Sequence, residues 1–242
     1  MNQFNNAVGN SAQVDLGLKN FMLGTYRYMA MAMAVTAVVA YMTSQYMLAN
    51  QSLIGLVTHP FMYIISLGII IFGFGAVGKN LHRMSLGGVL SFTFGFAAFM
   101  GVLMSTIALR YDEMIIAKIF FMTVAMFGSL SIFGYSTERN LSVYMKYAVA
   151  VIIGFVALSL IGFIVPSLSP YSGGVFGTVM LVGALIAFAL VTAWETQMLK
   201  RVYYGNAGNP AMEGKLAAFG AASLLLAFIN MFQLLLALFG RE

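Results

Sequence analysis

The chain has 242 residues, of which 61% are hydrophobic and 8% are charged, and its formal net charge is +5. A soluble domain of this size cannot bury so much apolar surface, so the composition excludes a water-soluble globular protein and indicates a chain whose solvent is largely lipid. The positive charge does not form a basic patch interleaved with aromatic residues, so we expect no binding to nucleic acid.

The first predicted elements are a polar N-terminal tail and two membrane spans. Residues 1–27 lack the short apolar region and small-residue cleavage site of a signal peptide, so we expect a polar cytoplasmic tail there and a retained first helix over 28–46. A transmembrane helix needs about 20 apolar residues to cross about 30 Å of hydrocarbon. The 51 residues from 28 to 78 contain no Asp, Glu, Lys or Arg, and a polar run at 43–60 divides them, so they hold two spans.

The middle of the chain supplies four more spans. Residues 84–109 hold the third span, and 119–137 hold the fourth, which can include the preceding turn because the Lys118 side chain can extend its charge toward water. Two prolines and paired glycines at 166–174 would end a helix. They therefore divide 147–194 into two spans.

The last apolar block, 216–240, is the seventh predicted span. Strands of a membrane β-barrel would alternate apolar and polar residues over about 10 positions, whereas these blocks are apolar on all sides. Glycines recur inside the spans, for which we favour close helix packing over any ligand role. We therefore predict an all-α integral membrane protein with a single seven-helix transmembrane domain over 28–240.

The cationic residues predict the orientation of the helices. Nine Lys and Arg residues fall in the N-terminal tail and in loops on the same side, and three fall on the other side. The nine are Lys19, Arg27, Lys79, Arg83, Arg139, Lys146, Lys200, Arg201 and Lys215, and the three are Arg110, Lys118 and Arg241. The positive-inside rule therefore places the N-terminus in the cytoplasm and, after seven spans, the C-terminus on the far side.

Several kinds of membrane enzyme and pump are not supported by the sequence. The two histidines, His59 and His82, both lie at helix ends, so the paired histidines of a zinc protease are missing. There is no cysteine, no phosphate-binding G-x-x-x-x-G-K-[ST] motif and no lysine within 216–240 that could hold retinal. We therefore expect a protein that is not an enzyme and has no resident cofactor.

Glu195 is the acid that interrupts an otherwise apolar helix. An ionisable group inside a span is costly and so indicates a functional site. It also lies some 20 residues past a helix start near Gly174, roughly 30 Å along the axis, which would place it at the cytoplasmic edge beside Lys200 and Arg201. Position alone leaves both interpretations open.

The last span carries small and polar residues on one face. Gly220, Ser223, Ala227 and Asn230 follow 3, 4, 3 spacing, so we expect this face to point into the bundle. The lipid-facing residues are then expected to be Leu224, Leu225, Phe228 and Leu235. Asn230 lies about 15 residues into the helix, where its amide needs a partner. We favour an interhelical hydrogen bond over a direct ligand contact.

Two segments resemble the signatures of the Bax inhibitor-1 family, also called the transmembrane Bax inhibitor motif family. They are Trp194-Glu-Thr-Gln197 and Leu224-Leu-Leu-Ala-Phe-Ile-Asn-Met-Phe232. Leu90-Ser-Phe-Thr-Phe-Gly-Phe96 is similar to the third helix of the family, and the segment from Val14 to Met29 is similar to its bacterial members.

This resemblance implies six helices around a central C-terminal helix, and a pair of aspartates from the last two helices that share a proton and titrate as a unit. The sixth-helix aspartate corresponds to Glu195 and the seventh-helix aspartate to Ala227, which cannot form such a pair. The family also has an arginine near the end of the second helix, and Arg83 is our preferred counter-ion for Glu195, with Lys79 and His82 as alternatives.

The resemblance further implies a function and a location. Family members are described as pH-sensitive calcium leaks, which predicts a leak for calcium or another cation with a degenerate carboxylate pair. Glu195 would then be the gate and a weak metal ligand, and calcium the permeant ion. The alternative is a non-conducting regulator of a membrane-bound ATP-dependent protease complex. Either protein would be a multi-pass component of the bacterial inner membrane, in contact with the lipid bilayer.

The predicted orientation can be tested with single cysteines, because the chain has none of its own. We expect a membrane-impermeant thiol reagent applied from outside the cell to label Ser169→Cys and to leave Asn140→Cys unlabelled until the membrane is opened. Labelling of Asn140→Cys in intact cells, with Ser169→Cys protected, would invert the topology.

Overall fold

The computed structural model of the protein describes residues 2–240, with the side chains of 15–240. The described residues form helices and loops without any strand. Seven helices or helix series are long and apolar enough to cross a membrane, which confirms the predicted fold class. They are α1 (Asn2–Ala49), the series α3 (Pro60–Gly68), η1 (Ile69–Gly73) and α4 (Phe74–Asn80), α5 (Leu86–Arg110), α6 (Glu113–Ser136), α7 (Ser142–Ile161), α8 (Gly174–Asn206) and α9 (Pro210–Phe239), while α2 (Ser52–Val57) and η2 (Pro166–Leu168) lie in connecting segments.

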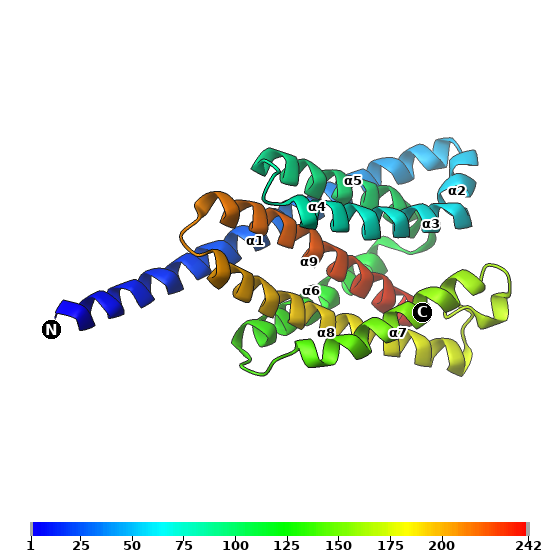
Figure 1. The fold of residues 1–242 in the computed structure, drawn as a ribbon. Helices are drawn as coiled ribbons and strands as arrows, with labels where there is room; N and C mark the ends of the chain where they lie inside the picture. Colours follow the sequence, from blue (N-terminus) through cyan, green and yellow to red (C-terminus); the bar gives the residue numbers. More distant parts are fainter. Residues whose placement is uncertain (1, 241–242) are drawn as a thin grey trace.

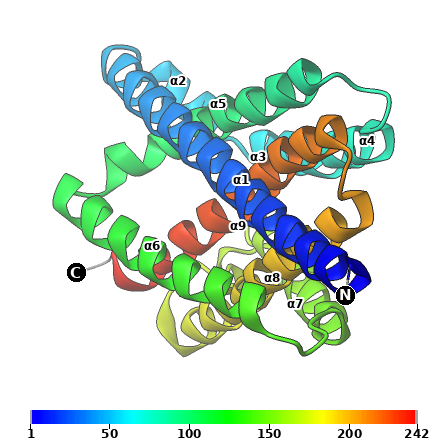
Figure 2. The same ribbon diagram turned by 90° about the vertical axis from the view of Figure 1, so that its left-hand side faces the viewer.

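The C-terminal helix α9 lies at the centre of the bundle. In Figure 1 it runs between the α4 and α5 pair and the α7 and α8 pair, and in Figure 2 the other helices surround it. In an apolar 18-residue segment of α9, 61% is buried inside the protein, whereas only 6% is buried in the corresponding segment of α7 and 6% in that of the α3 to α4 series. The described chain ends lie at opposite ends of the bundle, as an odd number of crossings requires (Figure 1).

The burial of α9 overturns one expectation from the sequence. Leu224, Leu225, Phe228 and Leu235 were expected to contact lipid, but they are among the most buried side chains of the protein. The helix packs against α1, α5, α6 and α8 at once, so its leucines meet other helices and form the core. The outer helices take the lipid-facing role instead.

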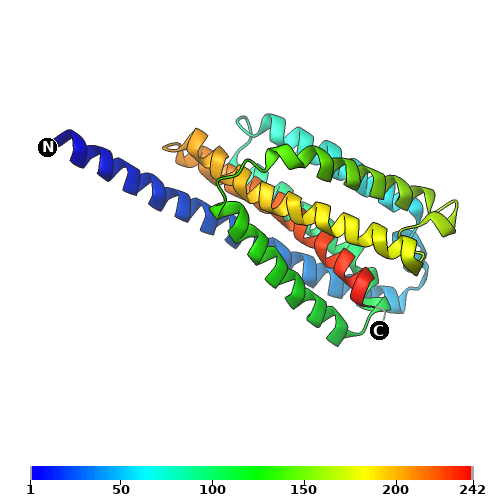
Figure 3. The same cartoon turned by 90° about the horizontal axis from the view of Figure 1, so that it is seen from below.

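The packed bundle begins earlier in the chain than residue 28. Leu18, Phe21, Met22 and Thr25 on α1 are buried, and the first three belong to the main core cluster with residues of α9. Helix α1 continues toward the N-terminus beyond the rest of the bundle (Figure 3). The boundary between tail and domain therefore falls within the first helix, because its apolar face extends further than its uncharged stretch.

Close contact between α1 and α5 depends on a glycine. Thr36 Oγ donates to the Ala97 carbonyl oxygen across the interface at 2.9 Å. A Cβ atom on Gly101 would lie 2.7 Å from the Thr36 carbonyl oxygen and 2.8 Å from Val39 Cβ, both closer than van der Waals contact. Gly95, also on α5, has no atom within 4 Å of such a Cβ.

This difference predicts opposite effects for two identical substitutions. Gly101→Ala forces α1 and α5 apart, so we expect its free energy of unfolding to be about 1–3 kcal/mol below that of Gly95→Ala, which gains helix propensity without a clash. Thermal unfolding of the two purified variants in the same detergent measures the difference. Equal stability would show that the interface does not need the glycine.

Candidate functional site

The two helices that carry the predicted site lie antiparallel and in a defined register. Helix α8 begins after Gly173, whose φ of 83° is accessible to glycine at low cost. Leu199 of α8 packs directly on Gly220 of α9, and Thr192 Oγ lies 3.3 Å from Met231 Sδ. The stretch 192–199 of α8 therefore faces 220–231 of α9, which brings the two signature segments together.

Glu195 lies at the middle of this contact. Ser223 Oγ of α9 donates a hydrogen bond to its Oε1 at 2.5 Å. The side chain is half-buried, and its second oxygen, Oε2, is buried with no hydrogen-bond partner among the described residues. The site is therefore an interior carboxylate with one oxygen occupied and one available.

Ala227 lies on the face of α9 that packs against α8. It follows Ser223 by one helical turn on the same face of α9, and it is buried. In the register above it falls between the contacts of Ser223 and Met231, opposite the stretch 192–195 of α8. The position expected to hold a second acid is thus occupied by a methyl group.

Asn230 is placed differently from the expectation. Its Nδ2 donates to the Leu226 carbonyl oxygen of its own helix at 2.7 Å, so this hydrogen bond lies within α9 and does not link two helices. It follows Ser223 by seven residues, about 10 Å along the axis. The structure therefore brings Glu195, Ser223 and Ala227 together and leaves Asn230 two turns away on the same face.

The expected cationic partner of Glu195 is not found within the described part of the chain. Arg83 lies exposed in the turn after α4. Lys200 and Arg201 are five and six residues beyond Glu195, so they project about 140° and 120° away from it around the helix. The carboxylate is stabilised instead by the hydroxyl group of Ser223.

The opposite face of α8 holds the loop between α6 and α7, a contact that the sequence argument missed. Gln197 Oε1 accepts from Leu141 N at 3.0 Å, and its Nε2 donates to the Arg139 carbonyl oxygen at 2.8 Å.

Two other side chains of α8 bond to the same region. Trp194 Nε1 donates to Ser142 Oγ at 3.1 Å. Arg201 Nη2 donates to Asn140 Oδ1 and to Gln197 Oε1, both at 2.9 Å. The 3, 4 spacing of Trp194, Gln197 and Arg201 was the signal that could have revealed this shared face.

Comparison with known proteins identifies the family. The family profile described as "Inhibitor of apoptosis-promoting Bax1" matches residues 18–242. The chain belongs to the Bax inhibitor-1 family. This finding confirms the resemblance seen in the two signature segments.

Bacterial relatives align with nearly the whole chain. An uncharacterized protein of Caulobacter vibrioides is 30% identical over 99% of this chain and 98% of its own length. The uncharacterized protein RP147 of Rickettsia prowazekii is 33% identical over 94% of this chain and 92% of its own. The inner membrane protein YbhL of Escherichia coli is 29% identical, covering 93% of both chains. A membrane location for this chain agrees with its relatives and with its apolar helices.

The Bax inhibitor-1 signature on α8 therefore does two things in this member of the family. Its acid, Glu195, faces α9, while Gln197 binds the loop between α6 and α7 and Trp194 binds Ser142, the first residue of α7. Fixing one face of a helix also fixes the direction of the opposite face. The loop contacts thus orient Glu195 toward Ser223.

Gln197→Ala tests this orienting contact. The substitution leaves the Leu141 N–H and the Arg139 carbonyl without their partner, so we expect the free energy of unfolding to fall by about 1–3 kcal/mol and trypsin to cleave faster after the exposed Arg139. Gln233→Ala, which removes a glutamine bonded to Met104 Sδ, is the matched control. Unchanged cleavage in Gln197→Ala would mean that the loop is held by other groups.

Proposed function

We propose that this Bax inhibitor-1 family member is a leak channel for calcium or another cation, and that Glu195 attracts the ion at the contact between α8 and α9. The observation that supports this proposal is the carboxylate inside the bundle, which has one oxygen bound to Ser223 and one oxygen without a partner. An unpaired acid at membrane depth is costly, and such residues are generally kept for ion or proton movement.

The composition of the site favours passage of an ion over its storage. Calcium sites that hold the ion use six to eight oxygen ligands, including several carboxylates. Within the described residues no group of three or more Asp, Glu, His or Cys side chains comes together. One carboxylate with a neighbouring hydroxyl group gives weak binding, and a conducting site must release its ion as well as attract it.

The contact between Ser223 and Glu195 suggests how the leak would be closed. The hydrogen bond joins α8 to the central helix at a level where Leu224 and Leu225 are fully buried. A cation that reaches Glu195 competes with the Ser223 hydroxyl for the carboxylate. In the proposed mechanism, exchange of this hydrogen bond for an ion loosens the contact between α8 and α9.

A regulator of a membrane-bound protease complex is the rival function. One observation favours it, namely that Ala227 replaces the second carboxylate and so removes the proton-sharing pair implied by the family. A regulator would act through its loops and would carry no ions by itself. The two functions are therefore separated by measuring transport with the purified protein alone.

We expect liposomes that contain only this protein to take up calcium, as reported by an enclosed fluorescent indicator. Glu195→Gln should lower the initial rate about tenfold, because the attraction of the charge is lost, whereas Glu138→Gln in an exposed loop should not. A tenfold change corresponds to about 1.4 kcal/mol. Ser223→Ala should raise the uptake rate above that of the parent. Ser223→Thr, which retains the hydroxyl group, should take up calcium at the rate of the parent.

The same assay, run between about pH 6 and 8, examines the missing carboxylate. Ala227→Asp should create with Glu195 a coupled acidic pair and a stronger pH dependence than the parent shows, while Ala227→Asn and the double change with Glu195→Gln should not. Absence of uptake by the parent in the presence of correctly folded protein would refute the leak. It would leave the regulator as the better function.

A further inference from the structure

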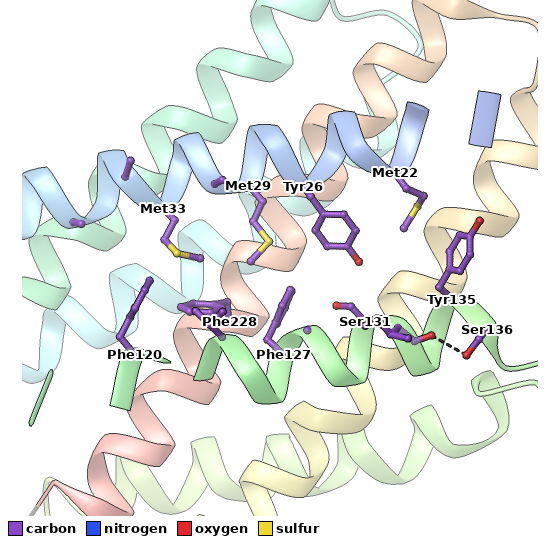
Figure 4. Close-up of a pocket in the computed structure, with 16 residues that line it drawn as sticks. Met22, Tyr26, Met29, Met33, Phe120, Phe127, Ser131, Tyr135, Ser136 and Phe228 are labelled. Carbon is purple, nitrogen blue, oxygen red and sulfur yellow. Dashed lines mark hydrogen bonds between the residues drawn. The ribbon is translucent and has the colours of Figure 1, made fainter. Parts of the chain in front are cut away.

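A groove on the side of the bundle separates α1 from α6. Both helices pack against α9, and the space between them has a volume of about 710 Å³. Figure 4 shows Met29 and Met33 of α1 facing Phe120 and Phe127 of α6, with Phe228 of α9 between them. Several of its wall residues are exposed at its mouth: Ala30, Ala34, Ala37, Val124 and Ile132. The groove therefore opens toward the lipid that surrounds a membrane-spanning bundle.

The two ends of the groove differ in polarity. The end nearest the start of α1 is lined by Tyr26, Ser131, Tyr135 and Ser136, whereas the deep end is lined by Met33, Phe120 and alanines. From Ser136 to Phe120 the groove follows 16 residues of α6, about 24 Å at 1.5 Å per residue. One leaflet of a bilayer has a hydrocarbon depth of about 15 Å. A single acyl chain therefore fits along the groove with its polar end at the membrane surface.

Ser131 provides independent support for an occupant. It is 5% exposed, and its Oγ has no hydrogen-bond partner among the described residues. Tyr26 projects from α1 toward it across the groove (Figure 4). A buried hydroxyl group without a partner is costly, and this one lies where a glycerolipid would present its ester carbonyl groups. The hydroxyl group can donate to such a carbonyl.

One cationic side chain contacts the polar end of the groove, and two more lie one turn from lining residues of α1. Lys200 Nζ donates to the Tyr135 carbonyl oxygen at 3.3 Å and lies 5.1 Å from the centre of the Tyr135 ring. On α1, Lys19 precedes the lining residue Met22 by one turn, and Arg27 precedes Ala30 by one turn. These charges complement a phosphate headgroup, and basic sites between helices bind anionic lipids in this way.

We infer that the groove between α1 and α6 binds one phospholipid with an anionic headgroup, taken from the leaflet at the N-terminal end of the bundle. Its acyl chain lies along the Met and Phe side chains, Ser131 donates to an ester carbonyl, and Lys200 lies beside the phosphate. This inference concerns a lateral face of the bundle and does not depend on ion conduction at Glu195.

Native mass spectrometry of the full chain in detergent tests the inference, with phosphatidylglycerol and phosphatidylcholine of identical acyl chains as probes. We expect the first phosphatidylglycerol to bind about fivefold more tightly than phosphatidylcholine, whose choline cation cancels the phosphate charge, since a cation near a headgroup of net negative charge contributes about 1 kcal/mol. Lys200→Gln should abolish this preference, and Lys118→Gln, at the opposite end of α6, should retain it. Equal binding of the two lipids by the parent would overturn the headgroup assignment.

A second pair of variants tests the groove itself. An added Cβ on Gly128 meets no atom within 4 Å, and the same is true of Gly154 on α7. Gly128 lines the groove and has room for a Cβ, so Gly128→Leu places a side chain in the groove and should weaken the first phosphatidylglycerol site about tenfold, while Gly154→Leu should not. If Gly128→Leu fails to fold, Ala34→Phe on the exposed part of the α1 wall also places a side chain in the groove and should weaken the same lipid site.

Two results would overturn the proposal. The first is equal lipid binding by the folded Gly128→Leu and Gly154→Leu proteins. The second is a dimer of the parent that Gly128→Leu abolishes without any change in lipid binding, which would assign the groove to a second copy of the chain.

Discussion

The burial of one helix on all sides is the constraint on which the rest of this structure depends. Every polar side chain on α9 must find its partner on a neighbouring helix or within α9 itself, since water does not reach the hydrocarbon region. Ser223 donates a hydrogen bond to Glu195 of α8, and Asn230 donates one to the Leu226 carbonyl oxygen within α9. The neighbouring helices in turn use small residues to come close, as Gly101 does between α1 and α5. The candidate site is thus a consequence of the same packing that forms the core.

Helix α8 connects the site to the loops. One face carries Glu195 and contacts the central helix, while the opposite face carries Trp194, Gln197 and Arg201 and binds the loop between α6 and α7. A rotation of α8 would break both sets of hydrogen bonds. A partner that moves this loop would therefore alter the environment of Glu195, which gives both proposed functions a common physical basis.

The lateral groove adds a contact between the lipid and the core. Phe228 of α9 belongs to its lining, and its ring lies 5.6 Å from that of Phe127 and 5.7 Å from that of Phe120 on α6. The same helix carries Ser223 slightly more than one turn before Phe228. An acyl chain in the groove would press on the helix that also supports Glu195. Lipid composition and ion movement would then be coupled through the position of α9.

The sequence by itself determined the fold class and the number of spans and marked Glu195 as an acid within a span, because charged groups cannot be placed in hydrocarbon at low cost and so divide the chain into blocks. It could not determine how each helix is rotated, because that depends on what surrounds it. The leucines of α9 lie in the core, Glu195 bonds to Ser223 instead of a cation, and α1 packs from Leu18 onward. The uncharged blocks had marked where helices cross, whereas tertiary packing decided which faces meet, where the bundle begins and which hydroxyl group stabilises the acid.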